Sequence, residues 1–248
     1  MNEGKNVLLR HSISTDLKKH IIISVAVTAA IVGFIALIGA LVGEGSDSKL
    51  LNGPTVVMLV VGFVWTISMV NRSFYYALCF NCSRKTAVRS VFAMTGINVL
   101  FTCALSILAE LSIVGISDIF HFGYRFKPMI EVMGVMKYEG LEDLVPVFGF
   151  QLLFFYFIFV TAMLVMALIL RVGKWTWMGF WIFYMLLFLG GNAVADALKA
   201  ASEDFGIDLG SGALVMIIVL SVLFSFLFVK LFRKAEMSNS FMGISKNT

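Results

Sequence analysis

Long uncharged apolar stretches recur along the chain and alternate with shorter polar segments. A bilayer core about 30 Å thick is crossed by about 20 residues of α-helix, because each residue rises about 1.5 Å. Six stretches meet or approach this length, and they lack the period-2 alternation of outer-membrane barrel strands. The predicted spans cover residues 21–43, 54–70, 90–116, 145–170, 175–191 and 212–232. We therefore predict an all-α membrane protein with six transmembrane helices in a single transmembrane domain, residues 1–248.

Composition supports this class and excludes a soluble domain. Hydrophobic residues make up 60% of the 248 residues, charged residues make up 14%, and the mean hydropathy is +0.95. A soluble globular domain is roughly half apolar and a quarter charged.

Lysine and arginine gather in the segments on one side of the predicted spans. Fourteen of the nineteen fall in the N-terminal segment, in residues 71–89, in the link at 171–174 and in the C-terminal tail. Asp and Glu are concentrated in the other loops. The positive-inside rule therefore places both termini and residues 71–89 in the cytoplasm, with an even number of crossings. The net charge of +4 then reflects topology, and we expect no nucleic-acid partner.

Two amphipathic helices are predicted outside the spans. In residues 1–20, Leu9, Ile13 and Leu17 repeat every four positions with most basic residues elsewhere, which is typical of a helix lying on the inner membrane surface. A short outer helix is predicted between the fifth and sixth spans, because apolar residues there repeat at near-helical spacing. These are Val194, Leu198, Ala201 and Phe205.

The first span also carries a series of small residues that permits close helix approach, either inside the bundle or at a dimer interface. They are Ala26, Ala29, Ala30, Gly33, Ala36 and Ala40.

The third span has one polar face. Its members are Thr95, Asn98, Thr102, Ser106 and Glu110. At 100° per residue they fall within an arc of about 120°. A carboxyl group inside a membrane costs about 2.5 to 3.5 kcal/mol on insertion scales. Two interpretations stay open. The face lines a translocation pathway or a subunit seam, or Glu110 is solvated near the outer interface while the hydroxyls bond to their own helix.

Groups that carry chemistry are scarce. The fragments "GEGSDSK" and "RVGKW" lack the spacing of a phosphate-binding P-loop. His11, His20 and His121 lie away from the span centres, so they give no support for a haem or metal site. Cys79 and Cys82 have metal or redox spacing, but no second pair accompanies them. We therefore expect no enzyme activity, cofactor or metal on this chain.

Residues 71–90, "NRSFYYALCFNCSRKTAVRS", combine basic and aromatic residues between two spans. The segment is longer than a turn requires, so a short helix is predicted with Phe74, Tyr75 and Leu78 on its apolar face. Such a helix lies on lipid or fits a groove on a cytoplasmic partner, and the residues alone do not separate these interpretations.

The stretch "YALCFNCSRKTAVRSVF" resembles the short cytoplasmic segment of bacterial ABC-2-type transporter permeases, where Ala-Leu, an aromatic residue and a Ser-Arg-Lys run precede the third helix. The matching residues are Ala77, Leu78, Phe80, Ser83, Arg84 and Lys85, whereas Cys79, Asn81 and Cys82 replace the family's small or Gly-containing stretch. "RVGKWTWMGFW" is similar to the Arg-aromatic-Gly-Lys start of the fifth helix in related permeases. Arg171, Gly173 and Lys174 match, and Val172 departs from the aromatic residue. The layout of an N-terminal interfacial helix, six spans and an outer helical insertion is also similar.

The resemblance implies a permease subunit that pairs with a second permease, identical or similar, while separate ATPase subunits bind ATP and Mg beneath them. Residues 71–89 would form the coupling helix that contacts the ATPase. Its docking residues would be Phe74, Tyr75, Leu78, Phe80, Arg84 and Lys85.

The implied activity is export or removal of a hydrophobic or amphiphilic compound, such as an antimicrobial peptide, at the bacterial cytoplasmic membrane. Two alternatives stay open: an ATP-independent secondary transporter, and a membrane scaffold or sensor subunit that transports nothing. A secondary transporter would need a site near mid-membrane, usually with broken helices, and the uncharged span centres without proline argue against it.

Overall fold

The computed structural model describes residues 2–42, 53–80, 82–120, 128–132, 136–137, 140–173, 175–176, 178–179, 182 and 209–234. Within these residues the chain is all-helical, and no strand occurs. The helices are α1 (Asn2–Val42), α2 (Gly53–Cys79), α3 (Arg84–Phe120), α4 (Met129–Val132), η1 (Leu141–Asp143), α5 (Leu144–Val172) and α7 (Leu209–Phe232). Five of them, α1, α2, α3, α5 and α7, are long and apolar enough to cross a membrane, which makes this chain a multi-pass membrane protein.

Five of the six predicted spans coincide with these long helices, which extend beyond the predicted limits at most ends. The sixth predicted span, 175–191, lies mostly outside the described residues, although the residues described within it are helical. The predicted outer helix between the last two spans lies entirely outside the described residues.

Local sequence explains where several helices begin and end. Ser83 precedes α3, and its hydroxyl oxygen accepts a hydrogen bond from the backbone N–H of Thr86 at 3.1 Å. Pro54 lies in the first turn of α2, where its missing N–H leaves no bond unmade. Gly173 ends α5 with a φ of 103°, a conformation that other residues rarely adopt, and its N–H bonds to the Ile169 carbonyl at 2.8 Å.

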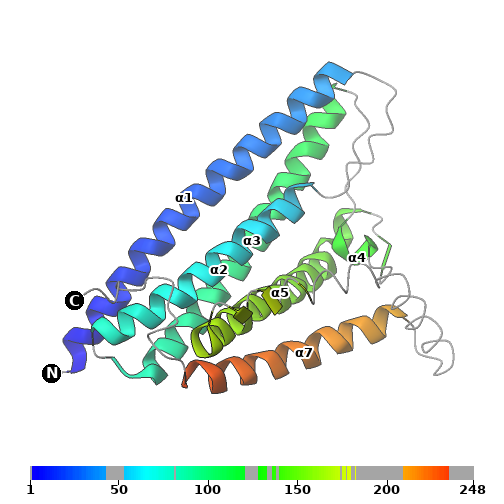
Figure 1. The fold of residues 1–248 in the computed structure, drawn as a ribbon. Helices are drawn as coiled ribbons and strands as arrows, with labels where there is room; N and C mark the ends of the chain where they lie inside the picture. The colour runs from blue at the N-terminus through cyan, green and yellow to red at the C-terminus, as the bar shows by residue number, and fades with distance from the viewer. Residues whose placement is uncertain are drawn as a thin grey trace.

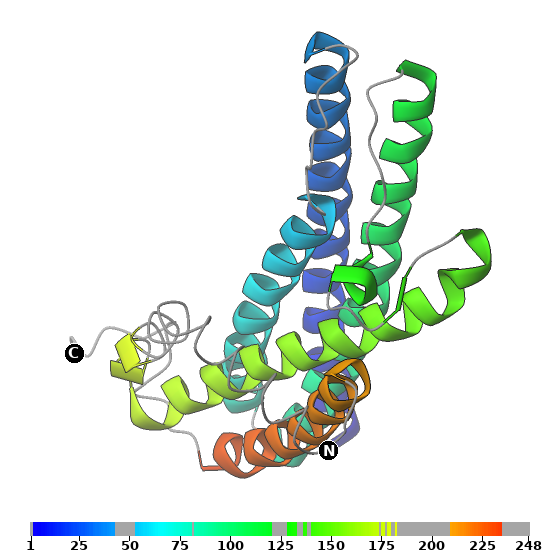
Figure 2. The ribbon, with the colours of Figure 1, turned by 90° about the vertical axis from the view of Figure 1, so that its right-hand side faces the viewer.

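The long helices form two groups (Figure 1). Helices α1, α2 and α3 run side by side, and α5 packs against α7 in the second group. Figure 2 shows that α1 and α3 extend well beyond the level of α5 and α7 at one end. Helices α2 and α3 also contact α5, so α5 connects the two groups.

Helices α5 and α7 run parallel to each other. Near their middles the rings of Phe157 and Phe224 are stacked with centroids 5.9 Å apart, and the hydroxyls of Tyr156 and Ser225 are 3.2 Å apart. Their N-terminal halves share one buried cluster and their C-terminal ends share another. Both helices therefore cross the bundle in the same direction.

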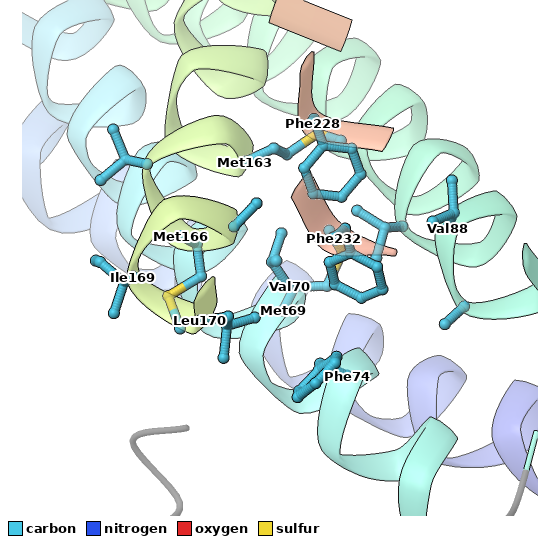
Figure 3. Close-up of a cluster of buried hydrophobic side chains, with 14 of the residues drawn as sticks. Met69, Val70, Phe74, Val88, Met163, Met166, Ile169, Leu170, Phe228 and Phe232 are labelled. Carbon is cyan, nitrogen blue, oxygen red and sulfur yellow. The ribbon is translucent and has the colours of Figure 1, made fainter. Parts of the chain in front are cut away.

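The largest hydrophobic cluster of the described residues lies where the C-terminal ends of α2, α5 and α7 meet the start of α3. Figure 3 shows Phe74 of α2, Phe232 of α7 and Leu170 of α5 gathered there. The rings of Phe74 and Phe232 meet edge to face with centroids 5.4 Å apart. We call this end of the bundle the basic end, because it carries the positively charged side chains of residues 72–89, Arg171 and residues 230–234.

Residues 71–79 do not form a separate helix between α2 and α3, which corrects the predicted coupling helix. They are the last turns of α2, and α3 begins at Arg84 after a short turn. The predicted apolar face exists, but it faces the bundle: Phe74 is buried and Leu78 packs against the same cluster. Burial against the protein's own helices therefore extends α2 past the predicted end of its span.

Residues 2–20 likewise continue directly into the first span, so the predicted interfacial helix is not a separate element. Helix α1 is a single helix from Asn2 to Val42, without a proline to interrupt it (Figure 1). Side-chain contacts from Asp16 and His20 to neighbouring helices hold this part of α1 along the bundle.

Of the small residues along α1, those described all lie on an exposed face; these are Ala26, Ala29, Ala30 and Gly33. An alanine side chain at position 33 would meet no atom within 4 Å. These four residues therefore do not mediate packing among the described helices.

Candidate functional site

The predicted polar face of the third span is completely buried in the bundle. We call it the polar seam. Its five members, Thr95, Asn98, Thr102, Ser106 and Glu110, each have 0% of their surface exposed. Helices α1, α2 and α5 supply the partners that cover it. Since a buried polar group without a partner is costly in a membrane, the contacts of the seam determine how these helices fit together.

Near the N-terminal end of the seam, His20 of α1 contacts Asn98 of α3. The distance between His20 Nε2 and Asn98 Oδ1 is 2.9 Å. The Asn98 amide nitrogen also donates to the Gly62 carbonyl at 3.3 Å and to the Thr66 hydroxyl at 3.2 Å, both on α2. One amide therefore joins three helices.

These partners determine the positions of the protons. A carbonyl oxygen only accepts hydrogen bonds, so the amide group of Asn98 must direct its nitrogen toward Gly62 and its oxygen toward His20. His20 Nε2 must then carry the hydrogen that the Asn98 oxygen accepts. The hydroxyl of Ser24 lies 3.4 Å from His20 Nδ1 and is able to donate a hydrogen bond to this second ring nitrogen.

The His20 ring is further held by aromatic contacts. It stacks on Trp65 of α2 with ring centroids 4.2 Å apart and an interplanar angle of 19°. Phe101 of α3 approaches it edge-on at 6.5 Å. The imidazole is therefore sandwiched into the junction of α1, α2 and α3, with only 3% of its residue surface exposed.

On both sides of Asn98 along α3, the seam also contacts α5. Gln151 of α5 donates to the Ser106 hydroxyl at 2.6 Å, and the Thr95 hydroxyl lies 3.2 Å from the sulfur of Met163. Thr102 instead bonds to the carbonyl of Asn98 in its own helix at 2.6 Å. Some hydroxyls of the seam thus bond to carbonyls of their own helix, as one interpretation expected, whereas Ser106 also contacts α5 and Glu110 has none of its surface exposed.

Glu110 of α3 lies beside the first turn of α2. Its Oε1 accepts hydrogen bonds from Thr55, at 3.3 Å from the backbone N–H and at 3.1 Å from the hydroxyl. The first N–H groups of a helix have no partner within the helix, and a carboxylate there is favoured by the helix dipole. Glu110 therefore caps α2 from a neighbouring helix.

Helices α2 and α5 approach closely at Gly62. A Cβ atom at this position would lie 2.2 Å from the ring of Phe159, which is fully buried. The same glycine supplies the carbonyl that accepts from Asn98. Close packing and the polar seam thus meet at one residue.

The six residues predicted to dock an ATPase are divided by the structure. Phe74 is buried, while Tyr75, Leu78 and Phe80 are half-buried at the end of α2. Arg84 and Lys85 are exposed at the start of α3. The Arg84 guanidinium donates to the main-chain carbonyl of Arg233 beyond α7 and lies 6.0 Å from the centre of the Phe74 ring.

The nearby Arg72 belongs to α2 and pairs with Asp16 of α1 at 2.8 Å. Tyr76 donates to the other carboxylate oxygen of Asp16 at 3.4 Å. This basic residue of the predicted docking segment is therefore engaged within the chain itself.

Sequence reasoning missed His20 and Gln151 as partners of the seam. The histidine lies near the edge of the first predicted span, where an interfacial position is expected, and a lone Gln in an apolar run gives no indication of its partner. The one feature of the sequence that could have identified them is that both are polar residues in or beside a span.

The described residues contain no group of three or more His, Cys, Asp or Glu that could hold a metal ion. Cys79 is an exposed free thiol and Cys82 is half-buried. Comparison of the chain with protein-family models, with curated proteins and with solved structures gives no match.

Proposed function

We propose that this chain is a membrane-spanning permease subunit driven by a separate ATPase, which docks on the turn between α2 and α3. The observation that carries the proposal is the position of this turn. It lies directly on the largest buried cluster, in which α2, α3, α5 and α7 are packed together.

The cluster would transmit force from the turn into the membrane. Phe74 joins α2 to α7 through its contact with Phe232, and Arg84 joins α3 to α7 through the Arg233 carbonyl. Close-packed interiors transmit displacement rather than absorbing it. A partner that moved residues 80–85 would therefore move several helices together.

In this proposal the docking surface consists of the exposed Arg84 and Lys85 with the half-buried Tyr75 and Phe80, whereas Phe74 and Leu78 act from inside the bundle. The sequence resemblance to ABC-2-type permeases around residues 76–92 supports this assignment. ATP and Mg would bind to the partner ATPase.

The complete topology in this proposal has six crossings and two cytoplasmic termini. Helices α5 and α7 are parallel, so the chain that connects them has to return to the side from which α5 starts. Residues 175–191 are the apolar stretch available for that return. The exposed basic residues then gather on the cytoplasmic side of a bacterial inner membrane, in agreement with the positive-inside rule.

The polar seam serves in this proposal to hold α1, α2, α3 and α5 in register. Its side chains bond to side chains and backbone groups of α1, α2 and α5, or to carbonyls of α3 itself. A second permease subunit would complete the pathway for a hydrophobic or amphiphilic substrate such as an antimicrobial peptide.

The test is affinity purification of the tagged full chain from its own cell in mild detergent, followed by mass spectrometry of bound proteins. A stoichiometric P-loop ATPase is expected. Recovery of the chain without any ATPase would overturn the proposal and favour an ATP-independent carrier or a scaffold.

A further inference from the structure

One face of α7 at the basic end combines apolar and cationic residues around a hollow. The hollow has a volume of about 370 Å³, and its described lining consists of Phe226, Val229, Lys230, Arg233 and Lys234. These positions are spaced by three, one, three and one residues, so they form a single stripe along the helix. The stripe lies away from the buried positions Phe228 and Phe232, which face the rest of the bundle.

The stripe changes character along its length. On the membrane side, α7 exposes a continuous apolar surface, with Val222 and Phe226 each about two-thirds exposed. Beyond Val229, Lys230, Arg233 and Lys234 are all exposed. Acyl chains contact apolar surface, and anionic headgroups attract lysine and arginine at the membrane boundary. The apolar part of the stripe therefore lies where a phospholipid has its acyl chains, and the cationic part lies where it has its headgroup.

The positive charges of this stripe are not neutralised by neighbouring acids in the described structure. Arg72 pairs with Asp16, whereas no ion pair between two described residues involves Lys230, Arg233 or Lys234. Arg84 adds a further positive charge, because its guanidinium reaches the main-chain carbonyl of Arg233. Clustered cations around an open hollow favour an anionic ligand.

We propose that this stripe binds an anionic phospholipid, with the headgroup phosphate between Lys230, Arg233 and Lys234 and an acyl chain along Phe226 and Val229. The site requires only that the chain is embedded in a membrane. It does not depend on an ATPase or on transport.

The test uses the purified full chain in nanodiscs made of equal amounts of phosphatidylglycerol and phosphatidylcholine, with retained lipids counted by native mass spectrometry. The variant K230Q/R233Q/K234Q removes the cationic part of the stripe. Each lysine or arginine near an anionic surface contributes about five-fold to binding. We therefore expect the variant to lose at least about ten-fold in its preference for phosphatidylglycerol.

The matched control is K18Q/K19Q/R89Q, which removes three exposed basic residues from α1 and α3 at the same end of the bundle. It should lose much less of the preference for phosphatidylglycerol than K230Q/R233Q/K234Q does. Equal losses in both variants would show a diffuse charge effect and overturn the site. An unchanged preference in K230Q/R233Q/K234Q would also overturn it.

A second variant, F226A, tests the apolar part without changing charge. The side chain is exposed, so its removal leaves no internal cavity. Faster exchange of phosphatidylglycerol out of this variant is expected. Exchange at the rate of the unaltered chain would contradict acyl-chain contact along Phe226.

Discussion

The imidazole of His20 and the amide of Asn98 lie 2.9 Å apart in the interior of the bundle and connect α1 to α3. Because Asn98 also donates to Gly62 and Thr66, this pair fixes α1 against both α2 and α3. Its importance is structural in the first place: it supplies partners for polar groups that have no water to contact.

A double-mutant cycle measures this coupling. We expect His20→Phe and Asn98→Leu each to lower the free energy of unfolding, and the pair to show a coupling energy of about 1 kcal/mol, the scale found for hydrogen bonds between membrane helices. His20→Phe retains an aromatic ring against Trp65, so the cycle isolates the polar contact. The measurement is unfolding in mixed micelles by titration with SDS.

Ser112→Ala is the control for that cycle, because Ser112 is exposed and bonds to the Leu108 carbonyl of its own helix. It should change stability by less than about 0.5 kcal/mol. Additive effects of His20→Phe and Asn98→Leu would contradict a direct interaction.

Gly62→Ala should destabilise the bundle by about 1 to 3 kcal/mol, because the added methyl group would overlap the buried ring of Phe159. Gly96→Ala on α3 is the matched control, since a Cβ there meets no atom within 4 Å. Alanine is the better helix former, so Gly96→Ala should be neutral or stabilising by up to about 1 kcal/mol. The same SDS titration measures the free energy of unfolding of both variants. Equal stability of the two would show that α2 and α5 are not in close contact at Gly62.

Glu110→Leu should lower the free energy of unfolding by about 1 to 2 kcal/mol, because Thr55 loses the acceptor of its backbone N–H and of its hydroxyl. Glu110→Gln keeps an acceptor oxygen and should cost less than half as much. Circular dichroism during SDS titration measures both variants. If Gln proves as harmful as Leu, the carboxylate has a role other than capping α2.

Phe74→Ala should cost about 3 to 5 kcal/mol, since it opens a cavity in the cluster at the basic end. Phe34→Ala is the comparison, because Phe34 is 62% exposed on α1 and its loss opens no cavity. The difference in SDS midpoint between the two variants measures the effect. Equal midpoints would mean that Phe74 faces outward, as the docking segment predicted from sequence would have it.

Hydropathy was enough to predict an all-helical membrane protein and the positions of five long helices, because crossing a bilayer imposes a length and an uncharged surface. Helix ends were less predictable. Hydropathy marks the part of a helix that suits lipid, whereas α3 begins at Arg84, six residues before its predicted span, where Ser83 caps it.

The polar seam was also predictable only in part. Helical spacing alone grouped Thr95, Asn98, Ser106 and Glu110 on one face, and the structure buries them all. Their partners on other helices lie between 32 and 78 positions away for Asn98 and 55 positions away for Glu110, and spacing within one helix carries no information about such contacts. The apolar face of residues 74–78 was likewise recognisable, but not that it turns toward α7 rather than toward a partner.

The central claim is that an ATPase docks on the turn between α2 and α3, and crosslinking in intact cells tests it most directly. A photoreactive amino acid would replace Lys85, which is exposed at the start of α3 directly after this turn, and as a control Lys137, which is exposed near the start of α5 at the other end of the bundle. After illumination, the crosslinked protein is identified by mass spectrometry. We predict an adduct with a P-loop ATPase from position 85 and none from position 137. Adducts with lipid alone at position 85, or the same protein adducts from both positions, would contradict the account.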